Sequence, residues 1–369
     1  MAEPSSLVVL APYALRNWEG RPRRYLDAHP MPAGGKALVG AWFDNDEEVE
    51  REYHRKRNGL VRRMAAACGL VLRHYSTLRQ ARMIYCLDGM HYAMLLMLSQ
   101  YGLFNAEGKI IRRKAFHDKV WQNLASRLRS APAAFQLECI THEQFAASSE
   151  HLGPGRMILR PWKIDTDWFQ PAPEVLHLRA MLPGNISRDE SIVPPLLHQG
   201  LSITRIARLG HLAKHYAAEI ADPRFELVTN ASHQEYREHL HAATAVLLPI
   251  LKCDNPAGLT AAMEAISAGI PLLVNRSMGL TELLAECRYP VPMLDNLDPA
   301  AWARAYHRIE EMRESPEFAE KLDAARRLLI QHRSVLPGGD DWAQIHTAAC
   351  AAAPTAPVRQ PESASSLPA

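Results

Sequence analysis

The chain has 369 residues, of which 47% are hydrophobic and 22% charged, and its net charge is +2. This composition is typical of a soluble globular protein, the length favours two domains, and no apolar run approaches the ~20 residues that cross a bilayer. The six cysteines include no Cys-x-x-Cys pair, which favours reduced thiols and no metal site. The N-terminus lacks the apolar region of a signal peptide, which favours a cytoplasmic protein.

Charge is unevenly spread along the chain. Residues 1–170 contain 24 Lys and Arg against 17 Asp and Glu, so this half is basic and the remainder is acidic. A basic first half could meet an acidic acceptor or the inner membrane surface as a peripheral contact. Solvated helix faces, such as the one with Arg55, Lys56 and Arg57, explain the excess equally well.

The first half alternates between apolar runs that predict strands and amphipathic segments that predict helices. Strands are expected at residues 7–11, 36–43, 83–87, 109–116 and 135–141, and helices at 46–68, 91–100 and 143–152. Such alternation implies a mostly parallel sheet with helices on both faces. His117 and Asp88 each stand at the end of an expected strand, where ligands bind in such sheets.

The second half begins with a segment that is hard to interpret. Between residues 172 and 198 the clear signals are turns at Pro183-Gly184-Asn185 and Pro194-Pro195. The strand at 201–206 is expected to be the first of the second sheet. Later elements are a strand at 225–229, a helix opened by the capping-box pair Ser232 and Glu235, two helices within 298–333, a last helix at 340–353, and a disordered Ala/Pro/Ser-rich tail at 354–369.

Residues 246–271 are the most informative stretch. Their apolar start predicts a buried parallel strand, and Asn255-Pro256-Ala257-Gly258 predicts a tight loop. The helix that follows ends at Gly269, and a second apolar run comes after Pro271. Free N–H groups at a helix start suit a phosphate, and Glu264, one turn further on, could accept hydrogen bonds from ribose hydroxyls. An ordinary turn between a strand and a helix is the alternative interpretation.

This stretch resembles the nucleotide-sugar motif of family 4 glycosyltransferases, which are retaining enzymes of the GT-B fold. Asn255 stands where the family has a Glu, and one extra residue separates Gly258 from Glu264. The segment from Pro161 to Pro171 resembles the end of the family's N-terminal domain, with Lys163 in place of the usual Gly. The helix opened by Trp342 resembles the family's C-terminal Trp-containing helix. The resemblance extends over about residues 80–350 and is poor at 172–200.

The resemblance implies an α/β protein with two Rossmann-like domains that face a cleft. The expected N-terminal, acceptor-side domain is 1–168, and the expected C-terminal, nucleotide-sugar-binding domain is 169–353. The last helix, 340–353, is expected to cross back to the N-terminal domain.

The resemblance also implies roles for individual residues. Cations after the first strand of the C-terminal domain would neutralise the diphosphate, and the candidates are Arg205, Arg208 and Lys214. The donor would contact Asn255, Gly258, Leu259, Thr260 and Glu264. His117 would face the donor sugar, Asp88 would line the acceptor side, and Glu282 matches a Gly-x-x-Glu of the family. Asp88 and Glu282 could equally serve local structure.

We therefore predict a retaining glycosyltransferase of the hexosyltransferase type. It would move a sugar from a nucleotide-diphosphate sugar to a hydroxyl of a glycan, a lipid-linked acceptor or a small molecule, with the nucleotide sugar as co-substrate and no cofactor, metal or nucleic acid. Two alternatives stay open. One is a catalytically impaired GT-B protein that acts as a binding or partner subunit, and the other is a sugar-nucleotide epimerase or phosphorylase on the same fold.

Overall fold

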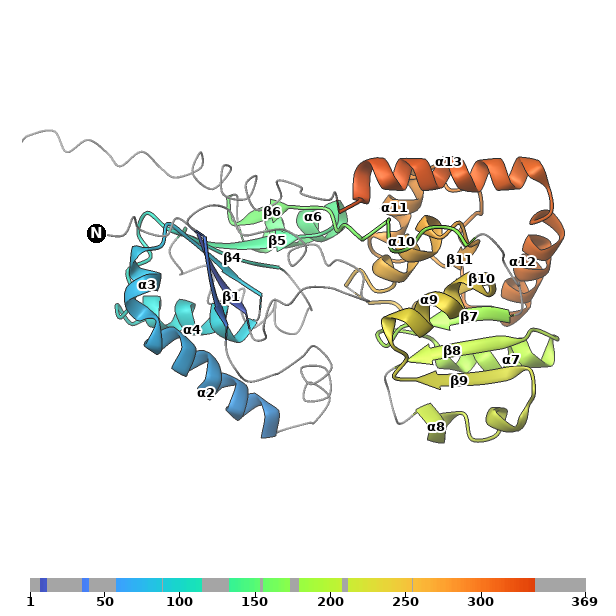
Figure 1. Ribbon diagram of the computed structural model, residues 1–369, viewed down its shortest axis with the longest axis horizontal. Coiled ribbons are helices and arrows are strands. Elements are labelled where there is room, and N and C mark those ends of the chain that lie inside the picture. Colours follow the sequence, from blue (N-terminus) through green and yellow to red (C-terminus); the bar gives the residue numbers. More distant parts are fainter. Residues whose placement is uncertain are drawn as a thin grey trace, which may run out of the picture.

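The computed structural model describes residues 7–11, 35–39, 58–87, 89–114, 133–152, 155–172, 179–207, 212–253 and 255–335. These residues form two α/β units, each built on a parallel sheet (Figure 1). The parallel α/β architecture predicted from the alternating pattern is therefore confirmed. Among the described residues, no helix combines the length and the apolar character that spanning a membrane would require.

The first unit contains a six-stranded sheet with the order β2-β1-β3-β4-β5-β6. One face packs against helices through residues such as Leu70, Leu95 and Leu96, which meet Ile84 and Ile111 of the sheet. The strands are β1 (Leu7–Ala11), β2 (Lys36–Val39), β3 (Met83–Cys86), β4 (Ile110–Lys114), β5 (Phe135–Cys139) and β6 (Met157–Leu159), and the helices are α2 (Asn58–Arg73), α3 (Tyr75–Gln80), α4 (Gly89–Gln100) and α6 (His142–Leu152).

The second unit contains a five-stranded sheet with the order β11-β10-β7-β8-β9. Its strands are β7 (Arg179–Pro183), β8 (Ile203–Ala207), β9 (Phe225–Thr229), β10 (Ala243–Leu248) and β11 (Leu272–Val274). Its α-helices are α7 (Val193–His198), α8 (Leu212–His215), α9 (His233–His241), α10 (Leu259–Ser267), α11 (Leu280–Glu286), α12 (Pro299–Met312) and α13 (Pro316–Arg333). Two short 3-10 helices, η1 (Glu190–Ile192) and η2 (Glu219–Ala221), lie in its loops.

Both faces of the second sheet are covered. Side chains of α10, α11 and α13 pack on one face, and those of α7 and α12 pack on the other (Figure 1). All six residues of β10 are buried, as expected for a central parallel strand. Sequence reasoning missed the strands β6 and β7 and the short helices α3, α7 and α8, and of these β7 matters most for the second sheet. It precedes the strand predicted to open this sheet, so the prediction that residues 201–206 form its first strand is wrong.

The missed strand has a physical explanation. β7 is only five residues long, begins with Arg179 and ends with Pro183, so it lacks an extended apolar run with a clear period. Its last four residues are nevertheless buried, because β8 and β10 flank it on both sides. Position in the sheet, rather than local pattern, makes this segment a strand.

The chain returns to the first unit after α13. The Ile164 amide donates to the Arg333 carbonyl at 2.9 Å, and the Val335 amide donates to the Ile164 carbonyl at 2.8 Å. Val335 is buried against Leu7 and Met83 of the first sheet. The predicted crossing helix at 340–353 and the tail lie outside the described residues, and the boundary at residue 168 stays a prediction.

Candidate nucleotide-sugar site

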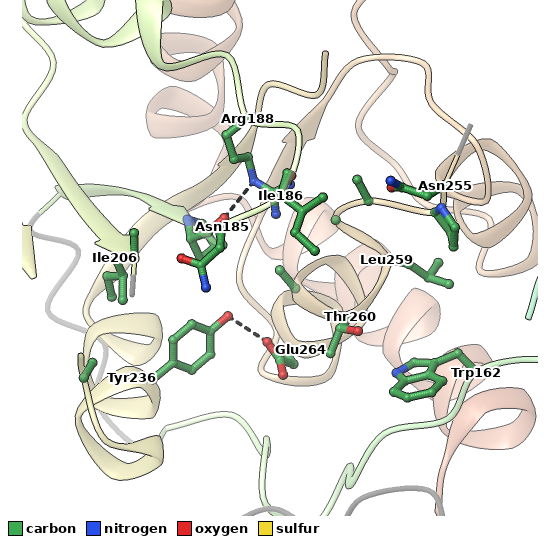
Figure 2. Close-up of a pocket in the computed structure, with 18 of the residues that line it drawn as sticks. Trp162, Asn185, Ile186, Arg188, Ile206, Tyr236, Asn255, Leu259, Thr260 and Glu264 are labelled. Carbon is green, nitrogen blue, oxygen red and sulfur yellow. Dashed lines mark hydrogen bonds between the residues drawn. The ribbon is translucent and has the colours of Figure 1, made fainter. Parts of the chain in front are cut away.

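A cavity of about 480 Å³ lies at the carboxyl ends of the strands of the second sheet. Its walls come from the ends of β7 and β8, the start of α9, the loop before α10 and the first turns of α10, and Ile140 and Trp162 close it from the first unit (Figure 2). Ligands of open α/β sheets bind at this edge. The lining residues used below are Gly184, Asn185, Arg188, Tyr236, Asn255, Pro256, Gly258, Leu259, Thr260 and Glu264.

The loop before α10 delivers the start of that helix to the cavity. Gly258 precedes the helix with a φ of +83°, and a Cβ there would lie 3.1 Å from Ile250 Cδ1, so glycine suits both the conformation and the space. The Ala257 amide donates to the Asn255 carbonyl at 2.7 Å, which closes the turn. No side chain in the described part of the chain caps α10. The first-turn amide of Thr260 has no intrahelical acceptor and suits an anion.

Glu264 lies one turn further along α10 and is half-buried in the cavity wall. Its Oε2 accepts a hydrogen bond from the Tyr236 hydroxyl at 2.7 Å (Figure 2). Burial and the nearby charge of Glu264 raise the pKa of Tyr236 well above its usual value. Tyr236 therefore stays a neutral donor that orients the carboxylate.

Arg188 is the arginine that lines this cavity among the described residues, and sequence reasoning missed it. Its Nε donates to the Pro183 carbonyl at 2.8 Å, and its Nη1 donates to the Ile186 carbonyl at 2.9 Å. A Cβ at Gly184 would lie 2.5 Å from Nη2, so the glycine leaves the space that the guanidinium occupies. Burial and the charge of Arg205 lower the pKa of Arg188 to about 10, which leaves it charged at neutral pH.

A signal for Arg188 was present in the sequence. Pro183-Gly184-Asn185 marked a turn, and a Gly turn at the carboxyl end of a strand is a common place for a phosphate. Because β7 was not recognised, that turn could not be assigned to the end of a strand. The predicted cations were consequently sought after β8 and not after β7, and of these Arg205 and Lys214 do not line the cavity.

The structure does not bring Arg205 to the cavity, although sequence reasoning placed it there. Its side chain is fully buried, and its Nε and Nη2 donate to Glu190 at 2.9 and 2.6 Å. Its Nη1 donates to the carbonyls of Leu182 and Ile206. Burial raises the pKa of Glu190, but the bonds from Arg205 and Tyr216 outweigh it and the net shift is downward. Arg205 is thus a core cation already satisfied by protein groups.

Of the remaining predicted residues, two lie outside the cavity lining and three lie outside the described residues. Lys214 is exposed on α8 and is not among the residues that line the cavity. Glu282 also lies outside the lining, on α11, where it contacts the first unit. Arg208, His117 and Asp88 lie outside the described residues.

Comparisons with known proteins agree with this architecture. No protein-family model matches the sequence, and no curated protein matches it. Among solved structures, a glycosyltransferase from Rickettsia africae ESF-5 is similar with a TM-score of 0.63 and 9% identity, covering 94% of this chain and 99% of that chain. An α,α-trehalose 6-phosphate synthase from Burkholderia multivorans is similar with a TM-score of 0.61 and 12% identity, covering 95% and 100%.

A third similar structure contains a nucleotide. The catalytic domain of starch synthase IV from Arabidopsis thaliana, bound to ADP and acarbose, has a TM-score of 0.54 and 11% identity, with 85% of this chain and 79% of that chain covered. At such identities these likenesses establish the fold. The two parallel α/β units form a GT-B fold, as predicted.

Proposed function

We propose that this chain is a retaining glycosyltransferase, related to family 4, that moves a sugar from a nucleotide-diphosphate sugar to a hydroxyl acceptor. The observation that carries this proposal is the single cavity wall that combines the start of α10, the carboxylate of Glu264 and the buried cation Arg188. The start of α10 suits a phosphate group, the carboxylate of Glu264 suits the ribose hydroxyls, and Arg188 suits an oxygen of the second phosphate.

In this proposal the diphosphate binds between the start of α10 and Arg188. The amides of Gly258 and Thr260 face one side of it, beside Leu259, whose own amide donates to the Pro256 carbonyl at 3.3 Å, and the guanidinium of Arg188 faces the other. Arg188 thereby takes the role that the sequence had assigned to Arg205 and Lys214, and Arg208, which lies outside the described residues, stays a second candidate for it. A cation and a helix start placed before the reaction stabilise the charge that develops on the leaving group.

Glu264 would hold the ribose by accepting hydrogen bonds from its hydroxyls, and Tyr236 would keep its carboxylate oriented. Asn255 would face the sugar, where its amide can both donate and accept. Trp162 and Ile140 would cover the sugar from the first unit. His117 keeps its proposed place facing the donor sugar, and Asp88 keeps its proposed place on the acceptor side.

The reaction needs no nucleophile from the protein in this proposal. The bond between the anomeric carbon and the diphosphate oxygen breaks, and the acceptor oxygen bonds to the same face of that carbon. The acceptor proton passes to the departing phosphate, so charge and protons balance. The protein positions both substrates, neutralises the diphosphate and excludes water.

We further propose a carbohydrate or lipid-linked acceptor on the first unit. The excess of basic residues in the first half of the sequence supports an anionic group on that acceptor or a contact with a membrane surface.

The proposal is tested with UDP-glucose, GDP-mannose and ADP-glucose in a thermal-shift screen, followed by calorimetry with the best ligand. Glu264→Ala should weaken binding roughly 10- to 150-fold, because a hydrogen bond to a charged group contributes about 1.5–3 kcal/mol. Glu311→Ala, on an exposed part of α12, is the matched control. Equal binding by Glu264→Ala and the control would refute the ribose role.

Asn255 favours one second candidate, a GT-B protein that binds nucleotide sugars without transferring them. The family has a Glu at this place, and the loop is one residue longer. Tight nucleotide binding without product from any acceptor would favour this candidate. An epimerase or phosphorylase would instead form a product without an acceptor sugar, or with phosphate as the acceptor.

A further inference from the structure

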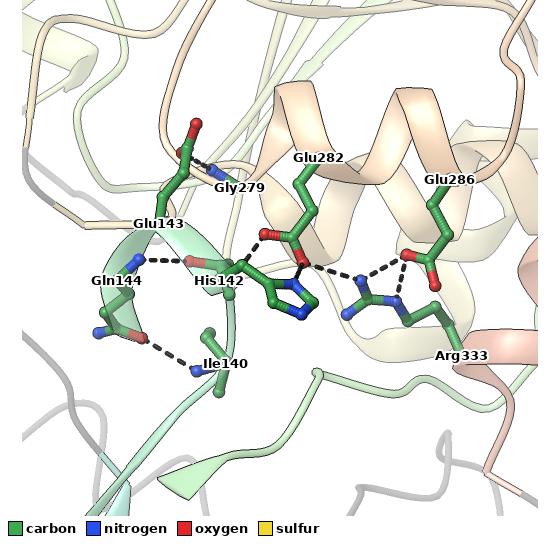
Figure 3. Close-up of polar contacts among 9 residues, drawn as sticks. Ile140, His142, Glu143, Gln144, Gly279, Glu282, Glu286 and Arg333 are labelled. Atoms are coloured by element: carbon green, nitrogen blue, oxygen red, sulfur yellow. Dashed lines mark hydrogen bonds and ion pairs between the residues drawn. The ribbon is translucent and has the colours of Figure 1, made fainter. Parts of the chain in front are cut away.

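The two units contact each other through the starts of two helices. In the first unit, the His142 amide at the start of α6 donates to Glu282 Oε2 at 2.7 Å, and Glu282 belongs to α11 of the second unit. In the second unit, the Gly279 amide at the start of α11 donates to Glu143 Oε2 at 2.8 Å, and Glu143 belongs to α6 (Figure 3). Each helix therefore supplies a carboxylate to the start of the other, where an anion is favoured.

The approach of the two helices is close enough to require a glycine. Gly279 has a φ of +76°, and a Cβ there would lie 2.6 Å from Thr141 Cγ2. Thr141 is buried and immediately precedes α6. The backbone of one unit thus rests directly on a side chain of the other, so a change in the angle between the units must disturb this contact.

A third group supports the carboxylate of Glu282. Arg333 is buried at the end of α13, where its Nε donates to Glu286 Oε2 at 2.8 Å and its Nη2 lies 3.4 Å from Glu282 Oε1 (Figure 3). The chain crosses back to the first unit directly after Arg333. The contact therefore lies beside the point where the chain crosses between the two units.

The contact is also continuous with the candidate donor cavity. Ile140, two residues before His142, lines the cavity from the first unit. Pro256 lines it from the second unit, and its Cβ would lie 3.3 Å from a Cβ at Gly279. The same short segments thus make the contact and the cavity wall.

We propose that Glu143 and Glu282 are positioning residues that hold the two units in the arrangement required for sugar transfer, an inference that rests on the proposed function. Single hydrogen bonds between a carboxylate and a helix start contribute little individually, so these contacts can break when substrates enter and reform when the cavity closes. Neither residue lines the donor cavity, so nucleotide binding to the second unit does not depend on them.

The test compares Glu143→Gln, Glu282→Gln and the double variant with wild type and with Glu311→Gln, an exposed control on α12. Small-angle scattering without ligand should give a larger radius of gyration for the double variant. The affinity for the nucleoside diphosphate of the best donor should stay within about threefold, because the donor groups are intact. Release of nucleoside diphosphate from that donor should slow roughly 10- to 100-fold, because small misplacements of the covering unit are costly.

The outcomes separate this proposal from the one it rests on. A folded double variant with wild-type scattering and wild-type turnover overturns the positioning role and leaves the proposed function intact. A parallel loss of nucleotide affinity and turnover also overturns it, since a local defect then explains both. If the wild-type protein binds none of the three nucleotide sugars, both proposals are overturned. Scattering from the double variant then measures only whether the contact between Glu143, Glu282 and the two helix starts holds the units together. Thermal unfolding of each variant verifies that it is folded. If the double variant is not folded, the same measurements are made on the two single variants.

Discussion

Arg188 offers the sharpest test of the candidate site, because the sequence pointed to other cations. We compare Arg188→Met, which removes the charge, with Arg188→Lys, which keeps the charge but loses the planar fork. The guanidinium anchors itself on two backbone carbonyls at 2.8 and 2.9 Å and lies against Gly184. A lysine cannot reproduce this arrangement, so charge and geometry can be separated.

The expected magnitude follows from one charge-assisted interaction with the diphosphate. Its loss should cost about 1.5–3 kcal/mol, which corresponds to a roughly 10- to 150-fold weaker affinity. Calorimetry with the nucleoside diphosphate and with the free nucleoside isolates the contribution of Arg188, because only the nucleoside diphosphate carries the anionic group. In the wild type, the nucleoside diphosphate should bind more tightly than the free nucleoside. The ratio of the two affinities should fall roughly 10- to 150-fold in Arg188→Met and by less in Arg188→Lys.

Two results would refute this reasoning. If Arg188→Met binds the nucleoside diphosphate as tightly as wild type, Arg188 does not contact the phosphates. If affinity for the nucleoside and for the diphosphate falls equally, the change has only disturbed the loop that Arg188 holds. Thermal unfolding of both variants, measured without ligand, reports the stability of that loop separately.

The other predictions concern stability. Gly258→Ala should lower the free energy of unfolding by about 1–2 kcal/mol, because the φ of +83° strains any side chain, and unchanged thermal unfolding would contradict this. Glu190→Gln should cost about 3 kcal/mol, because it leaves the buried Arg205 without its anionic partner. Since the folded pKa of Glu190 is lowered, its contribution should be complete above the unfolded value of 4.5 and be lost as the pH falls through the lower folded value. Urea titrations of wild type and Glu190→Gln should therefore converge in acid, and a constant difference would disprove the assignment.

Local sequence pattern was sufficient for the loop before α10. Asn255, Gly258 and Glu264 were predicted to line one site, and the structure places all three on one cavity wall. The reason is that their spacing within one strand–loop–helix segment fixes their relative positions. Five of the six strands of the first unit were predictable for a similar reason, since each lies in a short segment rich in apolar residues, and only β6 was missed.

The cations depended on information that local pattern does not contain. Arg188 and Arg205 look alike in the sequence, because each follows an isoleucine and a hydroxyl residue, in Ile186-Ser187-Arg188 and Ile203-Thr204-Arg205. Arg205 is turned into the core by β8 and paired with Glu190, whereas Arg188 is turned into the cavity by the loop after β7. Only the order of strands in the sheet decides which of them can meet a ligand.

The sequence by itself therefore determined the parallel α/β architecture and the loop that opens α10, because each depends on short-range periodicity and turn chemistry, whereas the GT-B fold was expected from the resemblance to a known family. The tertiary structure decided which strand begins the second sheet, which arginine lines the cavity, and that Glu282 meets His142 of the other unit. Those contacts join residues up to 140 positions apart, and their energy depends on burial and packing that exist only after the two units have come together.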